Sequence, residues 1–122
     1  MKTIILDTNL LIHSLEYHID IDEELRNVLN EPFEVAIIKT TEKELKGKKN
    51  ENLARKWLEK LHVKLINPPK DDINVDQAIL AVAEQNTLVA TQDKELKQKL
   101  KKKGIQVITI RQKKYFLMEN VL

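Results

Sequence analysis

Cysteine is absent from this chain of 122 residues, and glycine occurs only at Gly47 and Gly104. The lack of cysteine excludes disulfide bonds, thiolate zinc sites and cysteine nucleophiles, and it fits a reducing compartment. With so little glycine there is no Gly-rich loop to cradle phosphates, so nucleotide binding of the P-loop or dinucleotide-binding kind is unsupported. The longest apolar run, residues 78–83, is far too short to span a membrane.

Other common kinds of active site are also unsupported. The three histidines, His13, His18 and His62, do not have the spacing of metal ligands, and His13 is expected to be an ordinary helix-face residue. Ser14 has no evident base, which disfavours a serine hydrolase. A phosphatase with an aspartyl nucleophile would usually have a second Asp two residues after the first, where this chain has Asn9.

The composition that is present predicts one folded domain over residues 1–122. Hydrophobic residues make up 42% and charged residues 33% of the chain, which is enough apolar surface for a core. No signal-peptide pattern precedes the first predicted strand, so we expect a soluble, cytoplasmic protein. The net charge is only +2, but residues 94–114 hold nine Lys and Arg against the single acid Glu95. This basic third could bind a polyanion, or it could be a solvated lysine face.

Strands and helices are predicted to alternate along the chain. The expected strands are residues 3–6, 33–38, 63–66, 88–90 and 106–110. The expected helices are residues 10–17, 22–30, 41–46, 51–62, 72–85 and 94–103. Alternation of this kind is typical of an α/β fold, in which helices cover both faces of a parallel sheet. We therefore expect three layers around a central parallel sheet of about five strands.

Two details of packing are also predicted. In residues 51–62 the apolar residues Leu53, Trp57, Leu58 and Leu61 form one stripe, so Trp57 is expected in the core rather than in a functional site. The tail after Arg111 is apolar at residues 115–118, and it could pack on the sheet edge or on a second subunit.

A carboxylate follows the first strand directly. Residues 4–6 are apolar on consecutive positions, which predicts a strand buried on both faces, and Asp7 comes next. Because ligands bind at the carboxyl ends of parallel strands, Asp7 is the first candidate for a site.

Three later acids are candidates to join Asp7, and each also has a purely structural explanation. Glu44 follows the second strand, but its spacing from Thr41 is that of a helix capping box. Asp93 follows the fourth strand and could simply be an N-cap. Asp76 is in line with the apolar stripe of its helix, where a carboxylate is costly unless it is paired or binds something.

The four acids together predict a metal site. Carboxylates that converge on one edge of a sheet repel each other unless cations neutralise them. Hard oxygen ligands of this kind suit Mg²⁺ or Mn²⁺. Such ions could activate water for displacement at phosphorus, while the basic residues, Lys94, Lys97, Lys101 and Arg111 among them, hold a nucleic-acid backbone.

These residues resemble those of PIN-domain ribonucleases. The resemblance rests on residues 4–9 (IILDTN), on Glu44 in a short helix, on Asp76 followed by Ile79, and on residues 89–93 (VATQD). It implies a Rossmann-like sheet and metal-dependent endoribonuclease activity on single-stranded RNA. By position it makes Asp7, Glu44, Asp76 and Asp93 the catalytic and metal-binding acids. Thr8, Asn9 and Thr91 match supporting positions, and Gln92 stands where related sequences often have Asn.

The resemblance leaves the biological role open between two branches. The lysine-rich helix and basic tail are similar to PIN proteins that process ribosomal RNA, whereas the size and single-domain layout are similar to VapC toxins. The first branch is slightly favoured, and a homodimer is expected by analogy, with an antitoxin or a ribosome-assembly factor as a possible partner. The alternative is a catalytically silent PIN module that binds RNA or protein, in which the acids are only caps.

Overall fold

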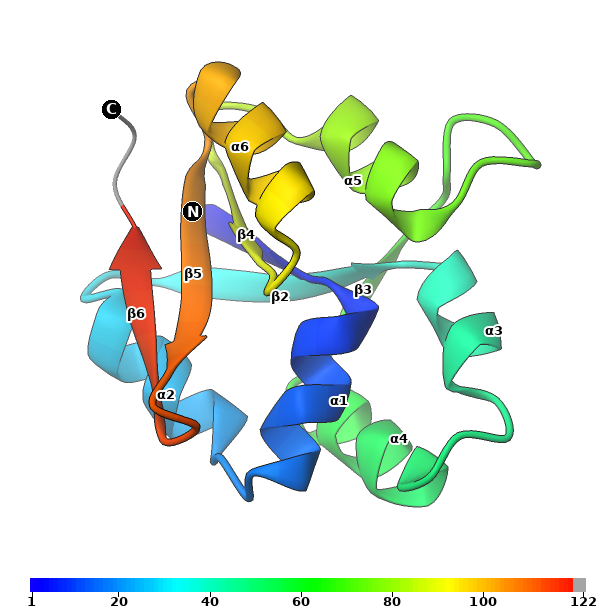
Figure 1. Ribbon diagram of the computed structural model, residues 1–122, viewed down its shortest axis with the longest axis vertical. Helices are drawn as coiled ribbons and strands as arrows, with labels where there is room; N and C mark the ends of the chain where they lie inside the picture. The colour runs from blue at the N-terminus through cyan, green and yellow to red at the C-terminus, as the bar shows by residue number, and fades with distance from the viewer. Residues whose placement is uncertain (120–122) are drawn as a thin grey trace.

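A six-stranded sheet forms the middle layer of the structure, a computed structural model that describes residues 1–119 (Figure 1). The strands are β1 (Lys2–Leu6), β2 (Phe33–Ile38), β3 (Lys64–Ile66), β4 (Thr87–Ala90), β5 (Gln106–Arg111) and β6 (Tyr115–Glu119). Their order is β3-β2-β1-β4-β5-β6; β1 to β5 are parallel, and β6 is antiparallel to β5. The predicted α/β fold is confirmed, with a sixth strand added at one edge.

Helices cover both faces of this sheet. They are α1 (Thr8–Glu16), α2 (Ile21–Val28), α3 (Thr40–Leu45), α4 (Glu51–Lys60), α5 (Val75–Val82) and α6 (Lys94–Lys102). In Figure 1 the sheet is twisted, so that β2 runs across the view and β5 and β6 run vertically; α5 and α6 lie above β2, and α1, α2 and α4 lie below it. No helix among the described residues is both long and apolar enough to cross a bilayer.

The two core clusters explain why β1 is continuously apolar. Successive side chains of a strand point to opposite faces of the sheet. Ile4 and Leu6 accordingly join the core beneath α1 and α2, while Ile5 joins the core beneath α5 and α6. All three are at most 1% exposed, so β1 is fixed in the middle of the sheet by burial on both faces.

The apolar tail packs on its own domain. Tyr115–Glu119 forms β6, in which Phe116 is buried and its backbone N–H donates to Oε1 of Glu24 on α2 at 3.0 Å. Of the two alternatives for the tail, the edge of its own sheet is the one observed. Residues 120–122 lie outside the described part of the chain.

Two helices differ from their predicted form. In α4 the buried residue is Ala54, and Leu53 is 43% exposed, so the expected stripe is wrong at Leu53; Trp57 packs against the core only in part. Helix α5 begins three residues later than expected, because Asn74 and Gln77 exchange hydrogen bonds in a capping box at 2.8 and 3.2 Å.

The strand order reverses on either side of β1. From β1 the chain moves outward through β2 and β3, and then crosses to β4 and β5 on the other side. Such a reversal leaves a crevice outside the carboxyl ends of the two central strands, which is where ligands bind in open α/β sheets. In this chain those strands are β1 and β4, which end just before Asp7 and Thr91.

Candidate active site

Asp7 is the buried centre of this crevice. It lies between β1 and α1 and is 2% exposed. Its Oδ2 accepts a hydrogen bond of 2.7 Å from Oγ1 of Thr91, and its backbone N–H donates to the carbonyl of Ala90 at 2.9 Å. Burial raises the pKa of the Asp7 carboxyl, and the charges of Asp93 and Glu44 add to this, against the lowering effect of the Thr91 hydroxyl.

The carboxylate of Glu44 is bound by Thr8, the residue after Asp7, and does not cap its own helix. Oγ1 of Thr8 donates to Oε1 of Glu44 at 2.6 Å, which links the start of α1 to α3. The capping-box explanation of Glu44 is wrong, since α3 begins at Thr40 and has no side-chain cap, and Oγ1 of Thr41 is buried without a partner among the described residues. The carboxylate is therefore oriented by the site and not by the helix end.

Asp93 is both an N-cap and a member of the site. Its Oδ1 accepts from the N–H of Leu96 at 3.0 Å, which confirms the cap at the start of α6. Its own N–H donates to Oγ1 of Thr91 at 3.1 Å. Thr91 thus joins Asp93 to Asp7, so that one buried hydroxyl fixes the spacing between the carboxyl ends of β4 and β1.

Asp76 lies in the first turn of α5, with the other three acids around it. Burial is the largest of the effects that together raise its pKa to about 6; the others are the charges of Asp7 and Asp93, a hydrogen bond with Asp93 and the charge of Glu44. Each of the other acids therefore acts on Asp76, which places all four in one electrostatic cluster. No Lys or Arg lies within ion-pair distance of any of the four among residues 1–119.

The acids open onto two adjoining hollows that share Asp76 and Asn74. The first, of about 450 Å³, is lined by Asp7, Thr8, Asn9, Glu44 and Lys48 among others. The second, of about 250 Å³, extends along Asp93, Glu95 and Lys99. A larger hollow of about 820 Å³ lies near Phe33 and His62, at the opposite ends of β2 and β3, and it holds none of the four acids.

Comparison with known proteins agrees with this arrangement. The sequence pattern of a family described as "PIN like domain" matches residues 4–113. The chain belongs to this family. Its sequence is 40% identical to ribonuclease VapC4 of Methanocaldococcus jannaschii over 127 aligned residues, covering 95% of each protein.

Two solved structures share the fold of this PIN domain. The PIN domain endonuclease Utp24 matches with a TM-score of 0.85 and 24% identity, covering 98% of this chain and 92% of the other. The VapBC2 complex from Rickettsia felis, crystallised with a DNA fragment from its promoter, contains a chain that matches with a TM-score of 0.51 and 13% identity. That match covers 79% of this chain and 92% of the other.

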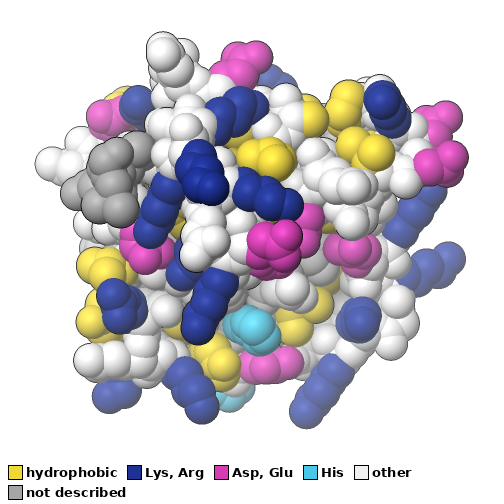
Figure 2. All heavy atoms as spheres, turned by 45° about the horizontal axis from the view of Figure 1, so that its top comes forward, with side chains coloured by type: hydrophobic (Ala, Val, Ile, Leu, Met, Phe, Trp, Pro, Cys, Tyr) yellow, Lys and Arg dark blue, Asp and Glu magenta, His cyan; other side chains and the backbone are white. Residues whose placement is uncertain are grey.

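Basic side chains surround the acidic cluster of the PIN domain. Figure 2 shows acidic side chains near the centre of this face with Lys and Arg around them. Two of the four residues predicted to bind RNA are already in ion pairs, since Nζ of Lys97 and of Lys101 each lie 3.3 Å from the carboxylate of Glu119. Lys94 and Arg111 are exposed.

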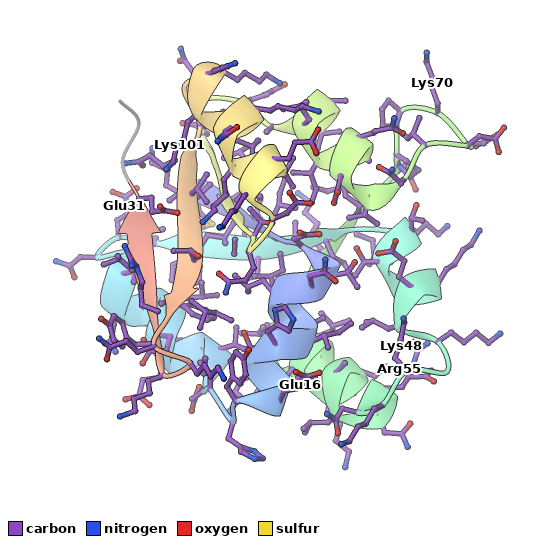
Figure 3. The ribbon with its side chains drawn as sticks, viewed as in Figure 1. Glu16, Glu31, Lys48, Arg55, Lys70 and Lys101 are labelled. Atoms are coloured by element: carbon purple, nitrogen blue, oxygen red, sulfur yellow. The ribbon has the colours of Figure 1, made fainter. Side chains whose placement is uncertain are left out.

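The sequence did not point to Lys48, Asn74 or Lys99 as members of the site. In Figure 3 Lys48 lies on the segment between α3 and α4, and it lines the hollow that holds Asp7. The place of these residues in the site depends on how distant segments meet in the folded chain. In the sequence each lies among other polar or charged residues, and nothing sets it apart from them. Gln92 turns away from the acids, and its Oε1 accepts from Thr109 Oγ1 and from the N–H of Ile110.

Proposed function

We propose that this PIN domain is a metal-dependent endoribonuclease that hydrolyses phosphodiester bonds in single-stranded RNA. The observation that carries the proposal is the cluster of four carboxylates at the switch point of the sheet, centred on the buried Asp7 and without a basic partner among residues 1–119. The name of its relative, ribonuclease VapC4, supports the same activity. The surrounding lysines supply the positive charge that an RNA backbone requires.

The donor set fits Mg²⁺ or Mn²⁺. All four ligand candidates, Asp7, Glu44, Asp76 and Asp93, offer hard carboxylate oxygens, and the raised pKa values of Asp7 and Asp76 mark a shortage of positive charge. No group of three acids or histidines within residues 1–119 already has the spacing of a metal site. Carboxylates that repel each other are expected to stand apart until a cation draws them in. A bound ion of this kind would polarise a phosphate oxygen and lower the pKa of an attacking water.

The chain's own residues hold the acids in place for this chemistry. The Thr91 hydroxyl holds the carboxylate of Asp7 and accepts from the backbone N–H of Asp93, and the Thr8 hydroxyl holds the carboxylate of Glu44, so the two hydroxyls orient two of the four carboxylates. Lys48 lines the same hollow as Asp7 and Asp76, where its ammonium can bind a phosphate oxygen. Asn9 is exposed at the rim of this hollow and is placed to contact the substrate.

The test compares RNA cleavage by the wild type and by two matched variants. Purified protein is incubated with single-stranded RNA and Mn²⁺, with and without EDTA. Asp7→Asn is expected to abolish cleavage, whereas Asp71→Asn, at an exposed loop position that lines neither hollow, is expected to leave it unchanged. Equal cleavage by wild type and Asp7→Asn, or no cleavage with any divalent ion, would contradict the proposal.

The competing reading is a catalytically silent module that binds RNA or protein. The N-cap made by Asp93 is the observation in its favour. It does not account for Glu44, which caps nothing and instead accepts from Thr8. RNA binding that persists in the complete absence of cleavage would favour this reading.

Of the two biological roles, we infer the VapC-type toxin, because the 40% identity to VapC4 extends over almost the whole chain. The likeness to Utp24 concerns the fold alone. A toxin of this kind would be cytoplasmic and would be held inactive by an antitoxin, and a homodimer remains our prediction. Co-expression with the product of an adjacent small gene tests this role: rescue of growth supports it, and growth inhibition that no neighbouring product relieves argues against it.

A further inference from the structure

One face of α1 leads away from the acidic hollow. Asn9 lines the hollow, and His13 and Tyr17 follow it at intervals of four residues. Residues four apart lie on the same face of a helix, with a rise of about 6 Å per step. The two rings therefore extend from the rim of the hollow in a line.

The two rings are stacked on each other. Their centroids lie 5.9 Å apart, and the angle between their planes is 21°. Both residues are partly exposed, and Tyr17 also packs against the core, which holds its ring in place. Nδ1 of His13 has no hydrogen-bond partner among the described residues, so the histidine ring is positioned by stacking and not by a polar contact.

A basic turn approaches this aromatic pair from the sheet. Nζ of Lys113 lies 5.7 Å from the centroid of the Tyr17 ring. Lys113 belongs to the tight turn between β5 and β6, closed by a 3.0 Å hydrogen bond from Lys114 N–H to the carbonyl of Arg111. Gln112 and Lys113 have positive φ angles of 53° and 56°, which is unfavourable for residues with a Cβ. The strained turn holds a cation above the tyrosine and leaves Arg111 and Lys114 exposed beside it.

We propose that His13 and Tyr17 form a stacking platform for a nucleobase of the RNA substrate, next to the phosphate that is cut. Proteins that bind single strands combine aromatic side chains, on which bases stack, with cations that follow the backbone. Here the platform begins one helical step from the acidic hollow, and Lys113 and Arg111 lie on its flank. This inference rests on the proposed function, since it names how that site holds RNA.

The chain contains a matched control for this arrangement. Trp57 on α4 also has a lysine above its ring, with Nζ of Lys60 4.6 Å from the centroid. Neither residue lines the two acidic hollows. If any aromatic side chain beside a lysine contributed to RNA binding, substitution of Trp57 would weaken binding as substitution of Tyr17 does. The platform predicts that only changes at His13 and Tyr17 weaken it.

The first experiment measures the binding of a fluorescent single-stranded RNA in EDTA, where cleavage is excluded. His13→Ala and Tyr17→Leu are each expected to weaken binding about five-fold or more, because stacking of a base contributes at least that much. His13→Phe and Tyr17→Phe keep a flat ring and should retain the affinity of the wild type. Trp57→Leu should also bind as the wild type does, and a melting curve for each variant checks that it is folded.

The second experiment uses RNAs in which one base at a time is removed from the sugar. The wild type should lose affinity at the position that stacks, and His13→Ala should be insensitive at that position. An identical profile for the two proteins overturns the platform, as does unchanged binding by both His13→Ala and Tyr17→Leu. If RNA is still cleaved when the platform test is negative, the platform is contradicted and the nuclease proposal stands. If binding depends on the base as expected but RNA is not cleaved with any divalent ion, the platform stands and the nuclease proposal is contradicted.

Discussion

The pKa of the single residue Asp76 shows how the clustering of acids lowers the stability of the folded protein when no metal is bound. Burial first, and the charges of Asp7 and Asp93 next, raise its pKa from 3.8 to about 6. The folded state therefore binds a proton more tightly than the unfolded state. The resulting contribution to stability is present below pH of about 4 and is lost as the pH rises through about 6.

Asp76→Asn is expected to stabilise the metal-free protein at pH 7. The gain should be on the order of 1 to 2 kcal/mol, after allowance for solvent screening at this partly exposed carboxyl, and it should vanish near pH of about 4. Urea unfolding in EDTA between these pH values measures the difference. Asp72→Asn, in the exposed loop before α5, is the control and should follow the wild type at each pH. A gain that does not depend on pH would contradict the assignment to Asp76.

Helix α6 and strand β6 are joined by one carboxylate between two lysines. Burial tends to raise the pKa of Glu119, but its contacts with Lys97 and Lys101 outweigh burial and hold the pKa below its usual range. The pairs are therefore formed at neutral pH and weaken as the pH falls through that lowered pKa. The pairs also engage two of the lysines that we predicted to bind RNA, and the one carboxylate offsets one of their two positive charges.

Glu119→Gln should thus change stability and RNA binding in opposite directions. Loss of the pairs is expected to reduce the free energy of unfolding by about 0.5 to 1 kcal/mol. The two lysines are then free for phosphates, so affinity for single-stranded RNA in EDTA should increase at low salt and the salt dependence should become steeper. Asp22→Asn, which removes the exposed pair with Arg26 within α2 and lines neither acidic hollow, is the matched control. A parallel decline in stability and binding would mean that the variant is merely disrupted.

The elements were predictable from the sequence where one local rule decided them. The apolar run at residues 4–6 and the alternation of strands and helices were sufficient for the sheet and its layers. Helix α5 was predicted to begin three residues too early, because Asp72 is as good an N-terminal residue as the true cap, Asn74. Strand β6 was not predicted, because its place depends on pairing with β5 and on the contact of Phe116 with Glu24.

The candidate site was predictable as a set of residues but not as a geometry. Asp7, Asp76, Asp93 and Glu44 could be named because each stands near a strand end or a helix start. The sequence could not separate capping from site geometry at Glu44, since the same residue type serves both, and only the contact with Thr8 decides it. Lys48 and Lys99 could not be found at all among so many lysines, because their role depends on where distant segments meet.

The whole molecule carries its acids at the centre of a basic face, and a divalent ion should bind them tightly enough to stabilise the fold. At a Mn²⁺ concentration about 100 times the dissociation constant, the gain is about 2.7 kcal/mol, which raises the melting temperature by several degrees. Asp7→Asn should remove this increase, and Asp71→Asn should keep it. Calorimetry with and without Mn²⁺ measures both, and an unchanged melting temperature of the wild type would favour the catalytically silent module.

The pairing of β1 with β4 also sets when the acids can meet during synthesis. Ile5 lies opposite Val89 in the sheet, so β1 cannot pair with its second neighbouring strand until the chain has been synthesised as far as β4. Thr91 and Asp93 follow β4 directly, and a chain that stops before them lacks the hydroxyl that orients Asp7. Parallel pairing of strands so far apart in sequence is slow to form. Until Thr91 and Asp93 have been synthesised, the growing chain holds only three of the four acids, and the nuclease proposed here would become active only after β4 and the start of α6 have joined β1.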